Sequence, residues 1–105
     1  MNEIPAKQYH KMKARHPKLL DAVDALGMAA AKAGPLSDKT RQLVQLAAAA
    51  AIRSEGAVHS HARRAVEAGA SAEEVRHAIL VLTSTIGFPT VVAATTWADD
   101  VLEVG

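Results

Sequence analysis

The residues with the most chemical potential lie in one short segment, from Arg53 to His61, which contains a serine, a glutamate, a glycine and two histidines. Histidine suits proton transfer near neutral pH because its unperturbed pKa is about 6.5. Ser54, Ala57 and His61 are spaced i, i+3 and i+7, so one face of a helix would carry all three. The segment is therefore the candidate site, with His61 as its general acid or base.

The two histidines of this segment are poor candidates for a shared metal. Residues two apart on a helix are separated by about 200° of rotation, so His59 and His61 would point in different directions. Glu55 and His59 have the favourable i, i+4 spacing, but Gly56 makes a helix between them uncertain. We expect no bound metal and no cofactor. His59 then either faces solvent or a subunit contact, or lines a substrate site.

The segment after His61 resembles a known family. The sequence HARRAVEAGASAEEV (61–75) is similar to the carboxymuconolactone decarboxylase family, which includes the alkylhydroperoxidase D-like proteins. The upstream sequence LSDKTRQLVQLA (36–47) resembles the preceding helix of that family, and IGFPTVVAA (86–94) resembles its Gly-x-Pro helix start. The resemblance covers about residues 36–102. It implies an all-α fold, a five- to six-helix orthogonal array of alkylhydroperoxidase D-like type with close-packed, Ala-rich helices.

The redox chemistry of this family is missing from the sequence. Its redox branch has Cys-x-x-Cys seven and four residues before the histidine, where this chain has Ser54 and Ala57 and no cysteine anywhere. The resemblance also places Gln42 where a glutamate usually assists the proton relay, and an amide cannot accept a proton at neutral pH. Peroxide reduction by that branch requires a thiolate nucleophile and a resolving thiol, so we predict no thiol peroxidase activity.

Three functions remain open. The first is a non-catalytic descendant, an oligomeric helical scaffold with or without a small bound ligand. The alternative is a non-redox acid–base enzyme of decarboxylase, lyase or isomerase type, because the decarboxylase branch acts on a small unsaturated lactone carboxylate without two cysteines. Its Glu-Trp pair is replaced here by Gly56–His59, so no specific lactone can be carried over. A Ser54–His61 hydrolase is the third, although no orienting carboxylate or Gly-x-Ser-x-Gly elbow accompanies it.

For the enzyme, the site residues divide by role. His61 would be the acid or base, Ser54 and Gln42 would position the substrate, and Arg53, His59 and Arg64 would bind it. An arginine fork suits a substrate carboxylate. Each has a structural alternative, since Ser54 can cap a helix and the arginines can be surface charges.

The elements that must position these residues are helical. Residues 1–16 read as a polar N-terminal arm or short helix, and 17–105 as a single helical domain. A helix with apolar residues at helical spacing should run from Pro17 to the break at Gly34-Pro35. Another should start near Ser37, an N-cap, and be buried along the run Ala47–Ala51.

Three further helices are expected. One runs from about Ala57 to Ala68, with Gly69 after its end. Ser71 and Glu74 form a capping box for the next, which should continue to Ile86 with a buried stretch at 78–82. The last covers roughly Thr90–Leu102, with Pro89 at its start.

Composition limits the partners. The net charge is only +1, and the basic cluster between Lys7 and Lys18 lacks a recognition motif, so we expect no nucleic acid. No apolar stretch approaches the ~20 residues that span a bilayer, and Met1–Lys13 lacks a signal-type apolar core, so we expect a cytoplasmic location and no membrane partner.

Ala-rich helices give a thin core, which favours a homo-oligomer. The resemblance implies a trimer, or a hexamer built of dimers.

Overall fold

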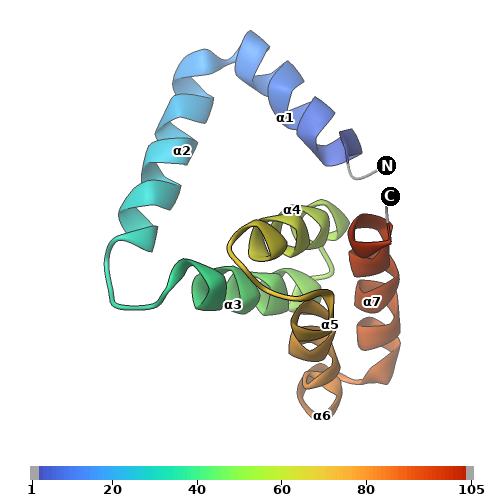
Figure 1. The fold of residues 1–105 in the computed structure, drawn as a ribbon. Coiled ribbons are helices and arrows are strands. Elements are labelled where there is room, and N and C mark those ends of the chain that lie inside the picture. Colours follow the sequence, from blue (N-terminus) through green and yellow to red (C-terminus); the bar gives the residue numbers. More distant parts are fainter. Residues whose placement is uncertain (1–2, 104–105) are drawn as a thin grey trace.

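The computed structural model describes the backbone of residues 3–103 and the side chains of residues 7–103. The described part of the chain is helical throughout, with short connections (Figure 1). Its elements are α1 (Glu3–Arg15), α2 (Pro17–Ala31), α3 (Asp38–Ala51), α4 (Glu55–Glu67), α5 (Ala72–Leu80), α6 (Thr83–Ile86) and α7 (Phe88–Leu102). This arrangement confirms the all-α prediction.

Helix starts follow local capping signals. The Ser37 side chain accepts a hydrogen bond from the backbone N–H of Thr40 at 3.1 Å and caps α3. The capping box of α5 is confirmed, because Ser71 and Glu74 each accept a hydrogen bond from the other's backbone N–H, at 3.0 and 2.9 Å. These contacts satisfy amide donors that have no partner within their own helix.

The core lies where α3, α4, α5 and α7 cross. Its largest fully buried side chains are Leu46, Ile79, Val58, Val75 and Val91. Fully buried alanines separate them on α3, α4 and α7, including Ala50, Ala62, Ala65, Ala94 and Ala98. A methyl side chain lets helix backbones approach closely, and this close packing holds α3 and α4 side by side around the site.

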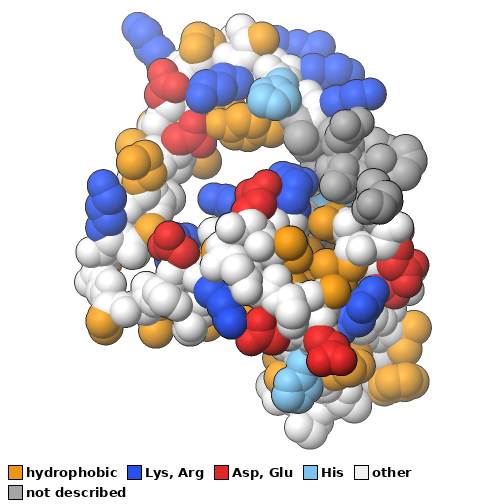
Figure 2. Space-filling view, viewed as in Figure 1, with side chains coloured by type: hydrophobic (Ala, Val, Ile, Leu, Met, Phe, Trp, Pro, Cys, Tyr) orange, Lys and Arg blue, Asp and Glu red, His pale blue; other side chains and the backbone are white. Residues whose placement is uncertain are grey.

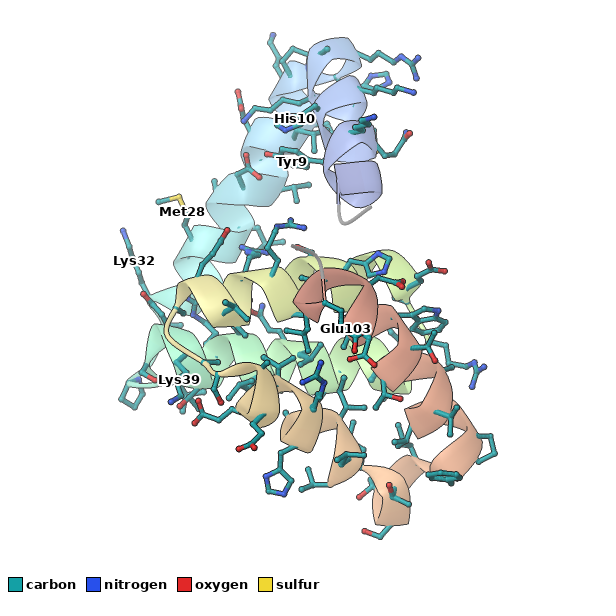
Figure 3. All side chains as sticks on the ribbon, turned by 45° about the vertical axis from the view of Figure 1, so that its right-hand side comes forward. Tyr9, His10, Met28, Lys32, Lys39 and Glu103 are labelled. Atoms are coloured by element: carbon teal, nitrogen blue, oxygen red, sulfur yellow. The ribbon has the colours of Figure 1, made fainter. Side chains whose placement is uncertain are left out.

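The first two helices form an arch beside this core. α1 and α2 meet at an angle and stand beside α3 and α4 (Figures 1 and 3). α1 contacts both α2 and α4. The 1–16 arm is therefore a helix over its described residues. Two contacts to Asp24 of α2 connect the helices of the arch. The Tyr9 hydroxyl of α1 donates to its carboxylate at 2.7 Å, and the Lys13 ammonium pairs with it at 3.2 Å. Between the arch and α3–α4 the molecular surface is hollowed (Figure 2).

α2 buries almost none of its apolar residues within one chain. Leu20 is its only buried side chain. The residues predicted to face a core include Leu19, Val23 and Leu26, and these are 56%, 51% and 70% exposed. α2 also ends at Ala31, earlier than Gly34. The predicted helix is present, but its apolar face does not meet the core of its own chain.

The prediction of one helix from Ser71 to Ile86 is wrong. α5 ends at Leu80, and Val81 follows it as the C-cap. The Thr83 hydroxyl donates to the Leu80 carbonyl at 2.8 Å, beside this break. α6 then forms a separate turn. Leu80 and Val81 are 50% and 54% exposed, so most of this apolar run is not buried in the chain.

Two helices begin earlier than predicted. α4 begins at Glu55 rather than Ala57, because Ser54 caps it directly. α7 begins at Phe88 rather than Thr90, because Gly87, with a φ of 92°, turns the chain immediately before it. Within residues 3–103, no helix combines the length and apolar character needed to cross a bilayer.

Candidate functional site

The centre of the candidate site is a hydrogen bond between α3 and α4. His61 Nδ1 lies 2.8 Å from the Oε1 atom of Gln42. Gln42 is only 5% exposed and His61 is half-buried, so the contact sits at the edge of the core. An amide oxygen can only accept, so the imidazole donates from Nδ1. This tautomer leaves the lone pair on Nε2 available as a base.

Its surroundings keep the imidazole of His61 neutral. Partial burial lowers the pKa of His61 below its ordinary value, and the positive charges of Arg64 and Arg41 lower it further. A neutral imidazole with one nitrogen fixed as donor is the form that a general base needs at neutral pH. Gln42 therefore supplies orientation rather than proton exchange.

Ser54 is engaged in capping. Its hydroxyl oxygen accepts from the backbone N–H of Ala57 at 3.4 Å, at the first turn of α4. Among the described residues, no hydrogen bond joins Ser54 to His61, so a nucleophile–base pair is not formed. Ser54 therefore lies at the N-cap of α4, the helix that carries His61, and its hydroxyl caps that helix.

Arg53 ties the α3–α4 turn to α7. It adopts the left-handed region with a φ of 59°, where a non-glycine residue costs of the order of 1 kcal/mol. Its Nη1 donates to the Thr90 hydroxyl at 2.8 Å. This contact fixes the guanidinium at the start of α7, and the structure does not bring Arg53 into contact with Gln42 or His61.

His59 points to the other side of α4, as the rotation between the two histidines predicts. It is 6% exposed, and its Nε2 donates to Asp100 Oδ2 of α7 at 2.9 Å. Because α4 already begins at Glu55, the Glu55 side chain shares this face. Ligand atoms of Glu55, His59 and Asp100 lie within 4.8 Å of one another, a spacing that a metal ion could bridge.

The second nitrogen of His59 has no partner in either arrangement. His59 Nδ1 is buried and has no hydrogen-bond partner. A metal on Nε2 would place the proton on Nδ1, and metal-bound histidines normally donate this proton to an acceptor. Here it would be buried and unpaired, at a cost of about 1–3 kcal/mol. When Nε2 donates to Asp100 instead, Nδ1 carries a lone pair that is equally buried and unpaired.

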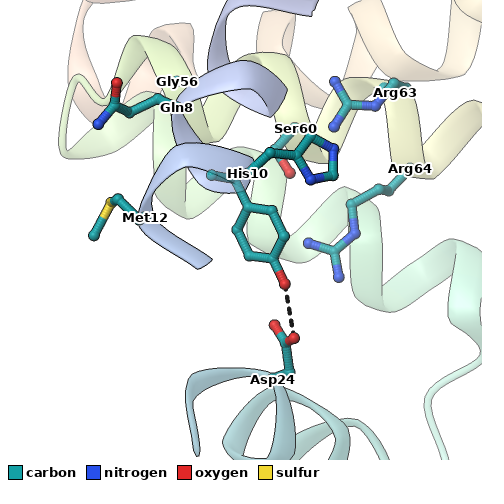
Figure 4. Close-up of a pocket in the computed structure, with 9 residues that line it drawn as sticks. Gln8, His10, Met12, Asp24, Gly56, Ser60, Arg63 and Arg64 are labelled. Carbon is teal, nitrogen blue, oxygen red and sulfur yellow. Dashed lines mark hydrogen bonds between the residues drawn. The ribbon is translucent and has the colours of Figure 1, made fainter. Parts of the chain in front are cut away.

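A cavity of about 700 Å³ lies between the arch and α4 (Figure 4). Arg64, the last predicted binding residue, is part of its wall. The remaining lining residues were not predicted and come from three helices: Gln8, Tyr9, His10, Met12, Asp24, Gly56, Ser60 and Arg63. The i, i+4 and i+7 spacing of Gly56, Ser60 and Arg63 could have indicated a shared face of α4, but the contribution of α1 has no sequence signal.

A smaller cavity of about 420 Å³ lies between the end of α2 and α3, with Arg41 in its wall. His61 lines neither cavity among the described residues, yet the two arginines that lower its pKa each line one of them.

Comparison with known proteins places this geometry in a family. A solved relative is the apo crystal structure of a carboxymuconolactone decarboxylase family protein from Legionella pneumophila, with a TM-score of 0.78, 28% identity, and coverage of 93% of this chain and 87% of that one. An uncharacterised protein of Haemophilus influenzae (strain Rd) is 44% identical over 59 residues, 56% of this chain. The chain spans about half of that relative, 52% of its length. The model of the Carboxymuconolactone decarboxylase family matches residues 17–100, so the chain belongs to the carboxymuconolactone decarboxylase family.

Proposed function

We propose that this chain is a non-redox acid–base enzyme that acts on a small carboxylate, with His61 as the general base. The observation that carries the proposal is the 2.8 Å contact between His61 Nδ1 and the buried Gln42 amide oxygen. It fixes the tautomer and the ring orientation, and it leaves Nε2 to accept a proton.

Each residue has a defined part in this chemistry. In an isomerase step, His61 Nε2 removes a proton from one carbon of the substrate and returns it to another. In a lyase step, it removes the proton while a group leaves the adjoining carbon. In a decarboxylase step, CO2 leaves and the imidazole, protonated from solvent, delivers a proton to the carbon that carried it. Gln42 holds the ring through Nδ1. Arg64, one helical turn from His61, supplies positive charge for the carboxylate. No step involves a thiol, because the chain contains no cysteine.

Turnover of small unsaturated carboxylates and their lactones, followed by ultraviolet absorbance, tests the proposal. His61→Gln should abolish turnover, because an amide cannot exchange the proton. His77→Gln is the matched control, since His77 is exposed on α5 and lies outside both cavities. The rate should rise with pH through the lowered pKa of His61. Equal rates for the wild type and His61→Gln would contradict the assignment.

A second proposal concerns assembly, and the exposed face of α2 supports it. We propose that the chain forms a homo-oligomer, a trimer or a hexamer built of dimers, through this face. Leu19, Val23 and Leu26 are each more than half exposed, and their i, i+4 and i+7 spacing places them on one face of α2. Contiguous apolar surface of this kind on a folded chain marks an interaction site.

Light scattering at micromolar concentration tests the assembly. The wild type should be oligomeric, and Leu26→Asp should shift it toward the monomer because a carboxylate would have to be desolvated in the contact. Lys32→Asp, a charge change beyond the end of the same helix, is the control. A monomeric wild type would contradict the proposal.

A further inference from the structure

We propose that Glu55, His59 and Asp100 form a binding site for one divalent metal ion, and that Zn²⁺ is the ion their chemistry fits. The sequence argued only against a metal shared by the two histidines of α4. The tertiary structure instead gives one of them, His59, two carboxylate partners. The site goes beyond the proposed function and does not depend on it, because His59 lies on the side of α4 opposite to His61.

Two helices bring the three ligands together. α4 begins at Glu55 and continues through Gly56, so Glu55 and His59 keep the i, i+4 spacing that places both side chains on one face. α7 packs against α4 and adds Asp100 near its C-terminal end (Figure 1). One ligand atom of each residue lies within 4.8 Å of the others. An ion bound there would connect the start of α4 to the end of α7.

The buried imidazole distinguishes this site from an ordinary acidic surface. Exposed carboxylates often lie near one another without binding a metal. His59 is only 6% exposed, and its Nε2 atom lies 2.9 Å from Oδ2 of Asp100. Packing around the ring therefore holds one nitrogen ligand in place before an ion arrives. The carboxylates of Glu55 and Asp100 are exposed, so they can rotate toward the ion while the imidazole stays fixed.

The two carboxylates have no basic side chain to balance their charge. Among the side chains of residues 7–103, no lysine or arginine forms an ion pair with Glu55 or Asp100. Asp99, the preceding residue of α7, is paired with Arg76 at 3.0 Å. Two carboxylates at this spacing repel each other, and a divalent cation between them would balance both negative charges.

One imidazole and two carboxylates suit Zn²⁺ among the common ions. Zn²⁺ binds histidine nitrogen at about 2.0–2.1 Å and carboxylate oxygen at about 2.0–2.2 Å, usually as a tetrahedron. Ligand atoms of such a tetrahedron are roughly 3.3–3.5 Å apart, so Asp100 has to move slightly away from Nε2 to admit the ion. Mg²⁺ and Ca²⁺ prefer oxygen ligands alone, and the imidazole of His59 therefore disfavours them. Water would fill the remaining position.

Metal binding requires the other tautomer of His59. Nε2 donates to Asp100 in the structure, whereas a metal on Nε2 would leave the proton on Nδ1. Nδ1 is buried without a partner in both cases, so the change of tautomer leaves the same atom unpaired. Histidine ligands normally donate this proton to an acceptor, and loss of such an acceptor lowers metal affinity by about 10–100-fold. We therefore expect a site of moderate affinity that fills when zinc is added.

Titration of the full chain with ZnCl2, in competition with a zinc-sensitive dye, tests the site. The wild type should bind one Zn²⁺ per chain, and excess Mg²⁺ should not displace it. Glu55→Gln and Asp100→Asn should each weaken binding by about 10-fold or more, because loss of an outer acceptor alone has an effect of this size. Glu67→Gln makes the same charge change at an exposed residue of α4 outside the cluster, so it should bind as the wild type does.

Nitrogen NMR locates the ion at His59. Saturation with Zn²⁺ should change the ring from the Nε2-protonated to the Nδ1-protonated tautomer in long-range ¹H–¹⁵N spectra, a change that binding elsewhere on the surface would not produce. His59→Gln should abolish binding, and circular dichroism checks that this buried substitution still folds. If it does not fold, the variants of the exposed Glu55 and Asp100 still provide the test.

Three results would overturn the inference. These are no saturable binding of Zn²⁺, equal zinc affinity of Glu55→Gln and Glu67→Gln, or an unchanged His59 tautomer at saturating zinc. Either of the last two would place the bound zinc at other surface groups. Turnover that depends on His61 is measured separately, so the proposed function would stand in all three cases.

Discussion

Replacement of Gln42 by leucine isolates the contact on which the proposed site depends. Leucine fills a similar volume but offers no acceptor to His61 Nδ1. The native hydrogen bond is 2.8 Å long, and Gln42 is 5% exposed. A hydrogen bond of this kind contributes about 0.5–1.5 kcal/mol net, and a fully buried donor left without a partner costs about 1–3 kcal/mol.

The exposure of His61 narrows the expected loss of folding free energy. His61 is only half-buried, so water can reach the imidazole and recover part of the lost hydrogen bond. The added apolar burial of leucine offsets a further part. We therefore expect Gln42→Leu to lower the free energy of unfolding by about 1 kcal/mol, which for a chain of this size is a decrease in Tm of roughly 4–8 °C. Urea unfolding at fixed protein concentration measures this change.

Function should suffer more than stability. Without Gln42 the ring can rotate and change tautomer, so kcat should fall while KM for the carboxylate stays close to its wild-type value. Gln42→Glu gives an independent check, because a carboxylate beside Nδ1 favours the imidazolium and should raise the pKa of His61 in an NMR titration.

Gln45→Leu provides the control for this experiment. Gln45 lies on the same helix, α3, but is exposed and does not contact His61. Its substitution should leave both stability and kcat nearly unchanged. The reasoning would be refuted if Gln42→Leu and Gln45→Leu behaved alike, since the buried amide would then contribute nothing specific to the imidazole.

Three further predictions concern stability. Leu46→Ala should cost about 2–5 kcal/mol in urea unfolding, because Leu46 is fully buried in the core and its removal leaves a cavity; a loss below 1 kcal/mol would contradict the assigned core. Ser71→Ala should lower the free energy of unfolding by about 1 kcal/mol in the same urea measurement, because the α5 cap is lost. Ser71→Asp should keep most of that stability, since aspartate also caps helices. Since the folded-state pKa of His61 is below the unfolded value of 6.5, the unfolded chain binds the proton first. Stability should therefore be full above that value and decrease as pH falls toward the lowered pKa, and His61→Gln should lack this component in unfolding curves measured across pH.

The fold could largely be predicted from the sequence because its helix starts are local. Ser37 and Ser71 satisfy amide groups a few residues away, and Pro17 fits the first turn of α2. The apolar run at 78–82 misled the prediction, since α5 ends within it at Leu80 and part of the run is exposed in the chain. Hydrophobic periodicity reports which residues could be buried, but it does not say against which surface.

The candidate site could likewise be predicted only in part. The sequence alone determined that no thiol chemistry is available, and the family resemblance paired Gln42 with His61 although 19 residues separate them. Only the tertiary structure decided which nitrogen of His61 is left open, that His59 meets Asp100, and that α1 closes a cavity against α4. These outcomes depend on contacts between helices far apart along the chain, and local propensity carries no information about such contacts.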